Sequence, residues 1–326
     1  MPVSGPSLRP VTGPQTRLAP VTARVIGDSD LSVYPVSLGA NVFGWLVDDS
    51  AARRVLDVYA DHGGQLIDTA DSYAGGRSET IIGSWMAGRA NRDRVVIATK
   101  IGKSADHPGL SAKAIAAAVD ASLERLRTDY IDLLFLHVDD RSVPFEETLL
   151  AVDRLVRAGK VRWMGASNHL GNRLVEARVA CGLLGVSPIV ALQNQYNLMR
   201  RAEYERDLAP VADAQQLGVM PRFALAAGFL SGKYRTRAEI MRSPRARELS
   251  PYLARRGMRV LGALESVADA QGVSMATVAI AWLLTRPNVV APIVSTTTPQ
   301  QVLELLAAPA ISLTRQQVQL LDEVSA

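Results

Sequence analysis

Short apolar runs alternate with longer stretches of helical period along most of this sequence. Stretches with a period of 3.6 residues lie between the runs, among them 111–128, 146–159 and 274–287. Runs that are apolar at successive positions predict strands covered on both faces, as in parallel sheets. Eight runs fit this description: SVYPVSLG (32–39), QLIDTA (65–70), VVIATKI (95–101), YIDLLFLHV (130–138), VRWMGASN (161–168), IVALQNQYN (189–197), LGVMPRFAL (217–225) and NVVAPIVST (288–296).

The alternation predicts an α/β fold, a (β/α)8 TIM barrel in which strand–helix units close on themselves. A two-domain doubly wound fold is the alternative. No linker-like change of composition follows residue 20, so we expect residues 21–326 to form a single barrel domain. Two β-prone runs around Gly27-Asp28 predict an N-terminal β-hairpin. Residues 1–20, rich in Pro, Gly, Ser and Thr, are predicted to be a disordered leader.

Composition narrows the class of protein. The chain has 326 residues, 48% of them hydrophobic, and its one cysteine, Cys181, excludes a disulfide framework and a Cys-based zinc cluster. No apolar run reaches the roughly 18 residues of a membrane span, and the start lacks the apolar segment of a secretory signal. The net charge of +4 is too small and dispersed for a nucleic-acid protein. We expect a cytoplasmic protein without nucleic-acid or membrane partners; its oligomeric state stays open.

Common cofactor and metal motifs are missing from the sequence. No GxGxxG follows the first strands, so a Rossmann dinucleotide site has no support. There is no HExxH, and the four histidines, at 62, 107, 137 and 169, are scattered. We therefore expect no metal site.

Ionisable residues end three consecutive predicted strands, where barrels carry their chemistry. Asp68 ends the second strand, Lys100 the third and His137 the fourth, and Tyr73 lies in the loop after Asp68. An isolated Asp, Tyr or His at such a place is more often structural. Lysine, however, is almost never fully buried without a partner, and Asp68 on the adjacent strand is the candidate.

Together these four residues describe a proton donor. Tyrosine has an ordinary pKa near 10, and a nearby ammonium lowers that pKa by stabilising the phenolate. Asp68 would keep Lys100 charged, and His137 would orient an incoming oxygen. Such a site can protonate an oxygen while a carbonyl carbon receives hydride.

Motifs around these residues resemble those of the aldo-keto reductase family over roughly residues 30–320. The likeness is to bacterial members related to the potassium-channel β-subunit-like and general stress reductase branch. It is carried by LIDTADSYAGGRSETIIG (66–83), IATKIG (97–102), YIDLLFLHVDD (130–140), GKVRWMGASNH (159–169) and LQNQYNLMRR (192–201).

The resemblance implies hydride transfer from NADPH or NADH to an aldehyde or ketone, such as a sugar or natural-product carbonyl. Tyr73 would be the general acid, Lys100 and Asp68 its tuning pair, and His137 the substrate orienter. Free N–H groups at the helix start Thr298-Pro299 suit an anion, as barrels often keep phosphate there. The implied cofactor-binding residues are Ser167, Asn168, Gln193, Arg222, Phe223, Leu225, Gly228, Gly232, Lys233, Ser295, Thr297, Gln301 and Glu304.

Three positions bear on substrate and cofactor choice. Pro221 is followed by Arg222, where related members usually carry an aromatic residue that stacks on the nicotinamide. Arg222 either stacks its guanidinium there, faces an anionic substrate group, or turns to solvent while Phe223 adjusts. Trp45, in the first loop, is expected to face the substrate cavity. Gln301 replaces a basic residue of some members, but the Arg-rich loop 232–247 can contact a 2′-phosphate and favours NADPH.

Two other functions compete with a carbonyl reductase. A cofactor-binding regulatory or redox-sensing subunit with little turnover has the same fold and site. A metal-dependent sugar isomerase needs clustered His, Asp or Glu ligands, which the sequence does not offer.

Overall fold

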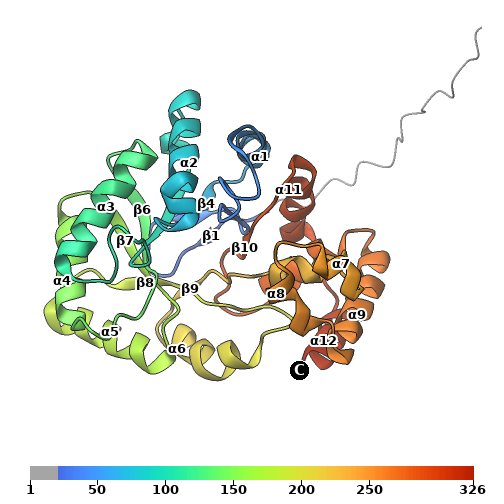
Figure 1. Cartoon of the computed structure of the whole chain (residues 1–326). Helices are drawn as coiled ribbons and strands as arrows, with labels where there is room; N and C mark the ends of the chain where they lie inside the picture. The colour runs from blue at the N-terminus through green and yellow to red at the C-terminus, as the bar shows by residue number, and fades with distance from the viewer. Residues whose placement is uncertain (1–20) are drawn as a thin grey trace, which may run out of the picture.

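Eight parallel strands form one sheet that curls round on itself, with helices on its outside (Figure 1). The computed structural model describes residues 21–326, so the predicted disordered leader lies outside the described residues. The strands are β3 (Ser37–Gly39), β4 (Leu66–Asp68), β5 (Val96–Ile101), β6 (Ile131–Leu136), β7 (Val161–Ser167), β8 (Ile189–Gln193), β9 (Gly218–Val219) and β10 (Ile293–Val294). They neighbour one another in chain order, and β10 pairs with β3. The barrel prediction is confirmed, and the doubly wound alternative is wrong.

Backbone hydrogen bonds join β9 to the segment that leads into β10. Val219 N donates to Asn288 O at 2.7 Å, and Val290 N donates to Val219 O at 2.8 Å. Both strands are shorter than their apolar runs of 217–225 and 288–296. Pro221 and Pro292 lie within those runs, and proline has no amide hydrogen for a strand ladder.

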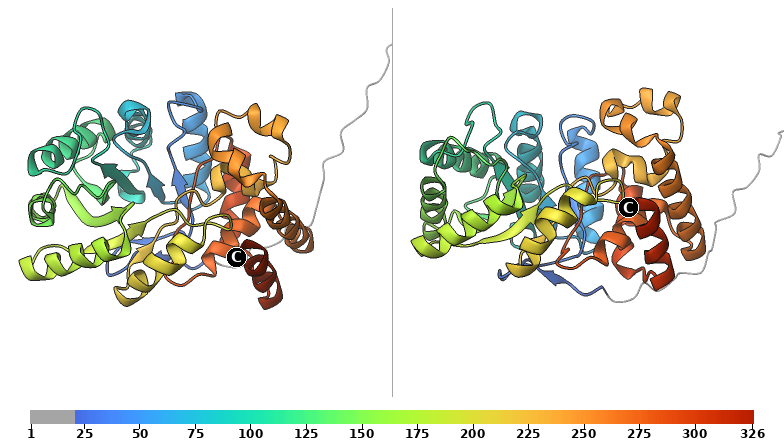
Figure 2. Two further views of the ribbon diagram at one scale, coloured as in Figure 1. Left: turned by 60° about the horizontal axis from the view of Figure 1, so that its bottom comes forward. Right: turned by 90° about the horizontal axis from the view of Figure 1, so that it is seen from below.

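Helices of similar length follow the strands of the first half of the barrel (Figure 2). The predicted stretches 111–128, 146–159 and 274–287 correspond to α3, α4 and α10. Serine caps α3 and α10, because Ser111 and Ser274 accept a hydrogen bond from the amide three residues on. The helices are α1 (Asp49–Asp61), α2 (Arg77–Arg89), α3 (Ala112–Leu126), α4 (Phe145–Arg157), α5 (Gly171–Leu184), α6 (Ala209–Ala214), α7 (Arg237–Met241), α8 (Ala246–Leu249), α9 (Arg255–Gln271), α10 (Met275–Leu284), α11 (Pro299–Leu306) and α12 (Arg315–Ser325).

The helix α10 is apolar on nearly every side because it is buried among other elements. Its residues from Ala276 to Leu283 are all buried, as expected of a helix that no face exposes to water. Within residues 21–326, no single helix is long and apolar enough to cross a membrane; α9 and α10 pass that test only as a pair bent by 94°.

The predicted N-terminal hairpin is present and lies across one end of the barrel (Figure 2). Its strands, β1 (Arg24–Val25) and β2 (Ser32–Val33), pair antiparallel. Ile26, Leu31 and Val33 are buried together with side chains from inside the barrel. Gly27 has a φ of +50°, and a Cβ there would lie 2.3 Å from the Val190 carbonyl oxygen. Glycine at this position therefore lets the hairpin approach the strands closely.

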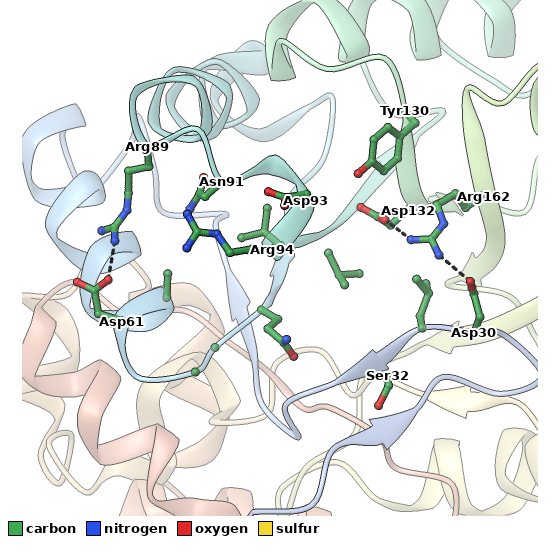
Figure 3. A pocket seen from close by; sticks show the side chains of 17 residues that line it. Asp30, Ser32, Asp61, Arg89, Asn91, Asp93, Arg94, Tyr130, Asp132 and Arg162 are labelled. Carbon is green, nitrogen blue, oxygen red and sulfur yellow. Dashed lines mark hydrogen bonds and ion pairs between the residues drawn. The ribbon is translucent and has the colours of Figure 1, made fainter.

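A cavity of about 570 Å³ opens beside the hairpin, at the amino-terminal ends of the strands (Figure 3). Several of its charged side chains pair with one another. Arg162 contacts both Asp30, at 2.8 Å, and Asp132, at 2.7 Å. Residues at this end of a barrel ordinarily serve stability, whereas chemistry takes place at the carboxyl ends. We therefore assign these ion pairs a structural role.

We predict that Ile26→Ala lowers the free energy of unfolding by about 2–4 kcal/mol, because it removes a fully buried side chain from the end of the barrel. Urea unfolding followed by circular dichroism measures the change. The matched control is Val25→Ala, since Val25 is 53% exposed and should change stability by less than about 0.5 kcal/mol. Equal changes in the free energy of unfolding for Ile26→Ala and Val25→Ala would contradict a stabilising role for the buried Ile26 side chain.

Candidate active site

Neighbouring strands bring three of the predicted catalytic side chains to the same end of the barrel. Asp68 is the last residue of β4, Lys100 lies one residue before the end of β5, and His137 directly follows β6. Parallel pairing aligns Asp68 with Ala98 and Lys100 with Phe135. All three side chains are buried, and Lys100 has no exposed surface at all.

The buried ammonium of Lys100 is held by oxygen atoms of β4 and of the residue after it. Its Nζ lies 2.8 Å from Asp68 Oδ2 and donates to the Thr69 carbonyl at 2.5 Å. The other carboxylate oxygen of Asp68 accepts a hydrogen bond from Gln193 Nε2 at 2.8 Å. Burial is the largest single effect and lowers the pKa of Lys100, but Asp68 and Tyr73 together outweigh it, so the net pKa is raised. Lys100 is therefore a charged group.

Tyr73 reaches this pair from the loop after β4. The Lys100 ammonium lies 4.8 Å from the centre of the Tyr73 ring. The Tyr73 and His137 rings lie 6.2 Å apart, edge to face. Gly76 helps to form the turn: its φ is +85°, and a Cβ there would lie 2.7 Å from the Arg125 side chain. The four predicted catalytic residues thus lie together.

The pKa of Tyr73 differs from what the ammonium alone predicts. Burial raises this pKa, and the opposing effect of Lys100 is smaller, so the net pKa lies above its ordinary value. The sequence predicts the Lys100 ammonium near Tyr73, but it does not predict how deeply the Tyr73 side chain is buried. Tyr73 consequently keeps its proton at neutral pH, as a proton donor must.

His137 is a neutral imidazole in this environment. Burial lowers the pKa of His137 to about 2, with further lowering by Lys100, Lys103 and Arg222. Its Nδ1 is buried and has no hydrogen-bond partner within residues 21–326. A neutral imidazole can donate one hydrogen bond, and this ring faces Tyr73.

The three residues expected at the nicotinamide carboxamide form a connected group at the ends of β7 and β8. Strand register pairs Ser167 with Gln193, and Ser167 Oγ donates to the Gln193 carbonyl at 2.8 Å. Asn168 Nδ2 donates to Ser167 Oγ at 3.1 Å and to the His137 carbonyl at 2.8 Å. These adjacent hydroxyl and amide groups suit a carboxamide, which both donates and accepts hydrogen bonds.

Arg222 turns inward, and its neighbour Phe223 turns outward. Arg222 Nη2 donates to Asn168 Oδ1 at 2.6 Å, whereas Phe223 is 39% exposed. The Arg222 guanidinium lies 5.2 Å from the Phe223 ring centre. Burial lowers the pKa of Arg222. Of the alternatives considered from the sequence, the one in which Arg222 faces solvent is wrong.

The other expected cofactor and substrate residues lie on the connections between elements and on α11, and share no hydrogen bond with the four central residues in the described part of the chain. Thr297 N bonds Gln301 Oε1 at 2.8 Å, and Thr298 caps α11. Trp45 is 57% exposed on the loop after β3. In the same group, Ser295 Oγ lies 2.5 Å from Asn41 Oδ1, the Glu304 carbonyl accepts a hydrogen bond from Thr277 Oγ1 at 2.8 Å, and Lys233 Nζ lies 5.1 Å from the Tyr234 ring centre. Gly228 and Gly232 have positive φ angles, and Leu225 is half-buried.

Two residues near the site were not predicted from the sequence. Lys103, three positions after Lys100, lowers the pKa of His137, and burial together with Arg222 lowers the pKa of Lys103. Asp71 lies two positions before Tyr73, is buried, and has no hydrogen-bond donor for either carboxylate oxygen within residues 21–326. Burial, with a contribution from Glu79, raises the pKa of Asp71 to about 6. Lys103 and Asp71 lie close in sequence to the predicted residues Lys100 and Tyr73, and this closeness is the only sign in the sequence that they belong near the site.

Comparison with known proteins adds to this geometry. The Aldo/keto reductase family model matches residues 35–326. A probable voltage-gated potassium channel subunit beta of Arabidopsis thaliana is 36% identical over 294 residues, 87% of this chain and 89% of that protein. An uncharacterized oxidoreductase, YrpG, of Bacillus subtilis is 33% identical over 92% of this chain and 94% of its own length. An aryl-alcohol dehydrogenase of Phanerodontia chrysosporium, named with NADP(+), is 32% identical over 90% of this chain and 83% of its own.

We predict that Asp71→Asn raises the free energy of unfolding at pH 8 by about 1–3 kcal/mol, because folding raises the pKa of the Asp71 carboxyl to about 6 and its charged form therefore destabilises the native state. The folded carboxyl binds its proton more tightly than the unfolded one. This group therefore stabilises the native state less as pH rises from about 4 to about 6, and the advantage of the variant should vanish near pH 4. Urea unfolding of both proteins between pH 4 and pH 8 measures the difference, and a pH-independent difference would contradict it.

Proposed function

Because the chain belongs to the aldo/keto reductase family, we propose that it is an NADPH-dependent reductase that transfers hydride to the carbonyl carbon of an aldehyde or ketone. Members of this family use nicotinamide cofactors. The observation that carries the proposal is the buried Lys100–Asp68 ion pair beside the Tyr73 ring. A buried cation next to a phenol is the arrangement that proton donation to a carbonyl oxygen requires.

The proton step follows from the surroundings of Tyr73. A reduced nicotinamide, when bound, supplies the hydride. The Tyr73 hydroxyl donates its proton to the carbonyl oxygen as negative charge develops there. Lys100 stabilises the phenolate that remains, and it stays charged because Asp68 lies 2.8 Å away. Since burial raises the pKa of Tyr73, proton transfer depends strongly on this ammonium.

His137 orients the substrate in this proposal. Its imidazole is neutral, because its pKa lies near 2, so it can donate a hydrogen bond to the carbonyl oxygen without carrying charge. Two donors, the Tyr73 hydroxyl and the His137 N–H, then converge on one oxygen. Such donors stabilise the charge that builds on that oxygen in the transition state.

Cofactor binding is assigned to residues on the later strands. Ser167, Asn168 and Gln193 would hold the nicotinamide carboxamide, with Arg222 and Phe223 beside the ring. Two observations support NADPH over NADH: the Arg-rich loop 232–247, and a relative named with NADP(+). The remaining residues of the proposed cofactor site are Leu225, Gly228, Gly232, Lys233, Ser295, Thr297, Gln301 and Glu304.

A second candidate is a regulatory subunit that binds the cofactor and turns over little. The 36% identity to a probable voltage-gated potassium channel subunit beta favours it. Turnover with NADPH across a broad panel of aldehydes and ketones separates the two functions. Rates at or below about one per minute, well under the usual range of enzymes, would favour the regulatory subunit.

We predict that Tyr73→Phe lowers kcat for an aldehyde such as 4-nitrobenzaldehyde by about 100-fold or more, because the general acid is lost. NADPH should still bind, with a dissociation constant within about threefold of the wild type, since Tyr73 is not assigned to the cofactor. Stopped-flow absorbance and fluorescence titration measure the two quantities.

The matched control is Tyr130→Phe, which removes a hydroxyl at the opposite end of the barrel and should retain wild-type turnover. If Tyr73→Phe also keeps wild-type turnover, Tyr73 is not the proton donor.

A further inference from the structure

We propose that Arg222 and Lys103 form an anion subsite that binds a carboxylate on the substrate, so that the preferred substrates are carbonyl compounds carrying such a group. This inference rests on the proposed reductase function and names its substrate class. It starts from a charge imbalance around Tyr73.

Arg222 is linked to His137 through Asn168, whose side chain bonds both Arg222 Nη2 and the His137 carbonyl, and Lys103 is an exposed residue of the loop after β5. Of the cations Lys100, Lys103 and Arg222, only Lys100 is paired within residues 21–326. Lys100 is neutralised by Asp68, whereas Arg222 and Lys103 form no ion pair with any side chain of the same residues. All three cations lower the pKa of His137. The open end of the barrel therefore carries two positive charges without a counter-ion from the described chain.

The acidic residues on the adjacent loop are engaged elsewhere. Asp139 contacts Arg173 at 2.9 Å and Arg141 at 3.3 Å. The carboxylate oxygens of Asp140 accept hydrogen bonds from Leu110 N at 2.8 Å and Ser142 Oγ at 2.6 Å. Neither residue is available to neutralise the anion subsite.

Arg222 also has unused hydrogen-bonding capacity. Its Nη2 is bonded to Asn168, but its Nε is buried and has no acceptor within residues 21–326. A guanidinium presents its donors in a fixed fork that matches the two oxygens of a carboxylate. A substrate carboxylate would accept a hydrogen bond from Arg222 Nε and would also neutralise the positive charge of the guanidinium.

Space for such a group exists beside the site. A cavity of about 520 Å³ lies between the loops that follow β5 and β6. Gly102 and Val138, the chain neighbours of Lys103 and His137, line it. A group in this cavity would lie one residue along the chain from Lys103 and from His137, so a substrate that enters between these two loops passes the proposed subsite.

The phosphates of the cofactor are the other possible source of an anion. Arg222 bonds Asn168, which is assigned to the nicotinamide end of the cofactor. We assign the loop with Gly228, Gly232 and Lys233 to the pyrophosphate of the cofactor. This loop carries its own cation, Lys233, and a Cβ at Gly228 would lie only 3.4 Å from the Lys233 Cε. The phosphates thus have a cation of their own, and Arg222, which lies beside the nicotinamide ring in our proposal, keeps a donor for the substrate.

The test compares two aldehydes that differ in charge, 4-carboxybenzaldehyde and its neutral methyl ester. We expect the wild-type kcat/KM with NADPH to be at least tenfold higher for the carboxylate at low ionic strength, and the ratio to fall with added salt. Arg222→Met should lower that ratio tenfold or more, and Lys103→Met a few-fold. Lys113→Met, the same substitution on the exposed face of α3, should keep the wild-type ratio.

Two results would overturn the anion subsite. One is a ratio near one in the wild type that Arg222→Met and Lys103→Met leave unchanged, with both aldehydes reduced; the reductase function then stands without the subsite. The other is an unchanged ratio together with a tenfold or greater rise in the NADPH dissociation constant of Arg222→Met, which would assign Arg222 to the cofactor.

A binding measurement tests the subsite without turnover. Calorimetric titration of the whole protein with benzoate and with benzamide compares a carboxylate with its neutral analogue. Tighter binding of benzoate, weakened at least fivefold in Lys103→Met or Arg222→Met, supports the subsite even where neither aldehyde is reduced and the reductase proposal fails. Equal binding of the two compounds overturns it.

Discussion

A fully buried ammonium ion is the constraint on which the rest of this site depends. Lys100 has no exposed surface, and an isolated charge in such a place is very costly. Asp68 and the Thr69 carbonyl compensate that charge, and Gln193 from the far side of the barrel completes the shell of Asp68. Because these groups come from β4, β5 and β8, the closed sheet and its register are needed to hold Lys100 charged.

Much of the fold followed from the sequence because the local pattern and the global fold agree. Continuous apolar runs marked the strands, and their carboxyl ends brought Asp68, Lys100 and His137 together. The lengths of β9 and β10 did not follow, since Pro221 and Pro292 interrupt pairing within apolar runs. The pKa direction of Tyr73 and the inward turn of Arg222 did not follow either, because both depend on burial by loops distant in sequence.

Charged side chains are arranged differently at the two ends of the barrel. At the amino-terminal end, Arg162 contacts both Asp30 and Asp132, and Arg92 also contacts Asp132, so two cations face two carboxylates inside the chain. At the carboxyl end, Arg222 and Lys103 are left without counter-ions from residues 21–326. Paired charges stabilise a surface, whereas unpaired charges at the mouth of a barrel favour negatively charged ligands. This contrast separates the structural end of the molecule from the functional one.

The apolar hairpin across the barrel has a consequence for the proposed proton transfer. Ile26, Leu31 and Val33 pack with the apolar side chains of the barrel interior, and such side chains cannot relay a proton from the hairpin to Lys100. In the proposed reaction, a phenolate formed at Tyr73 would therefore regain its proton through the opening by which ligands come and go. Reprotonation of Tyr73 and exchange of ligands would then take place through the same opening of the barrel, so the timing of the two events would be linked.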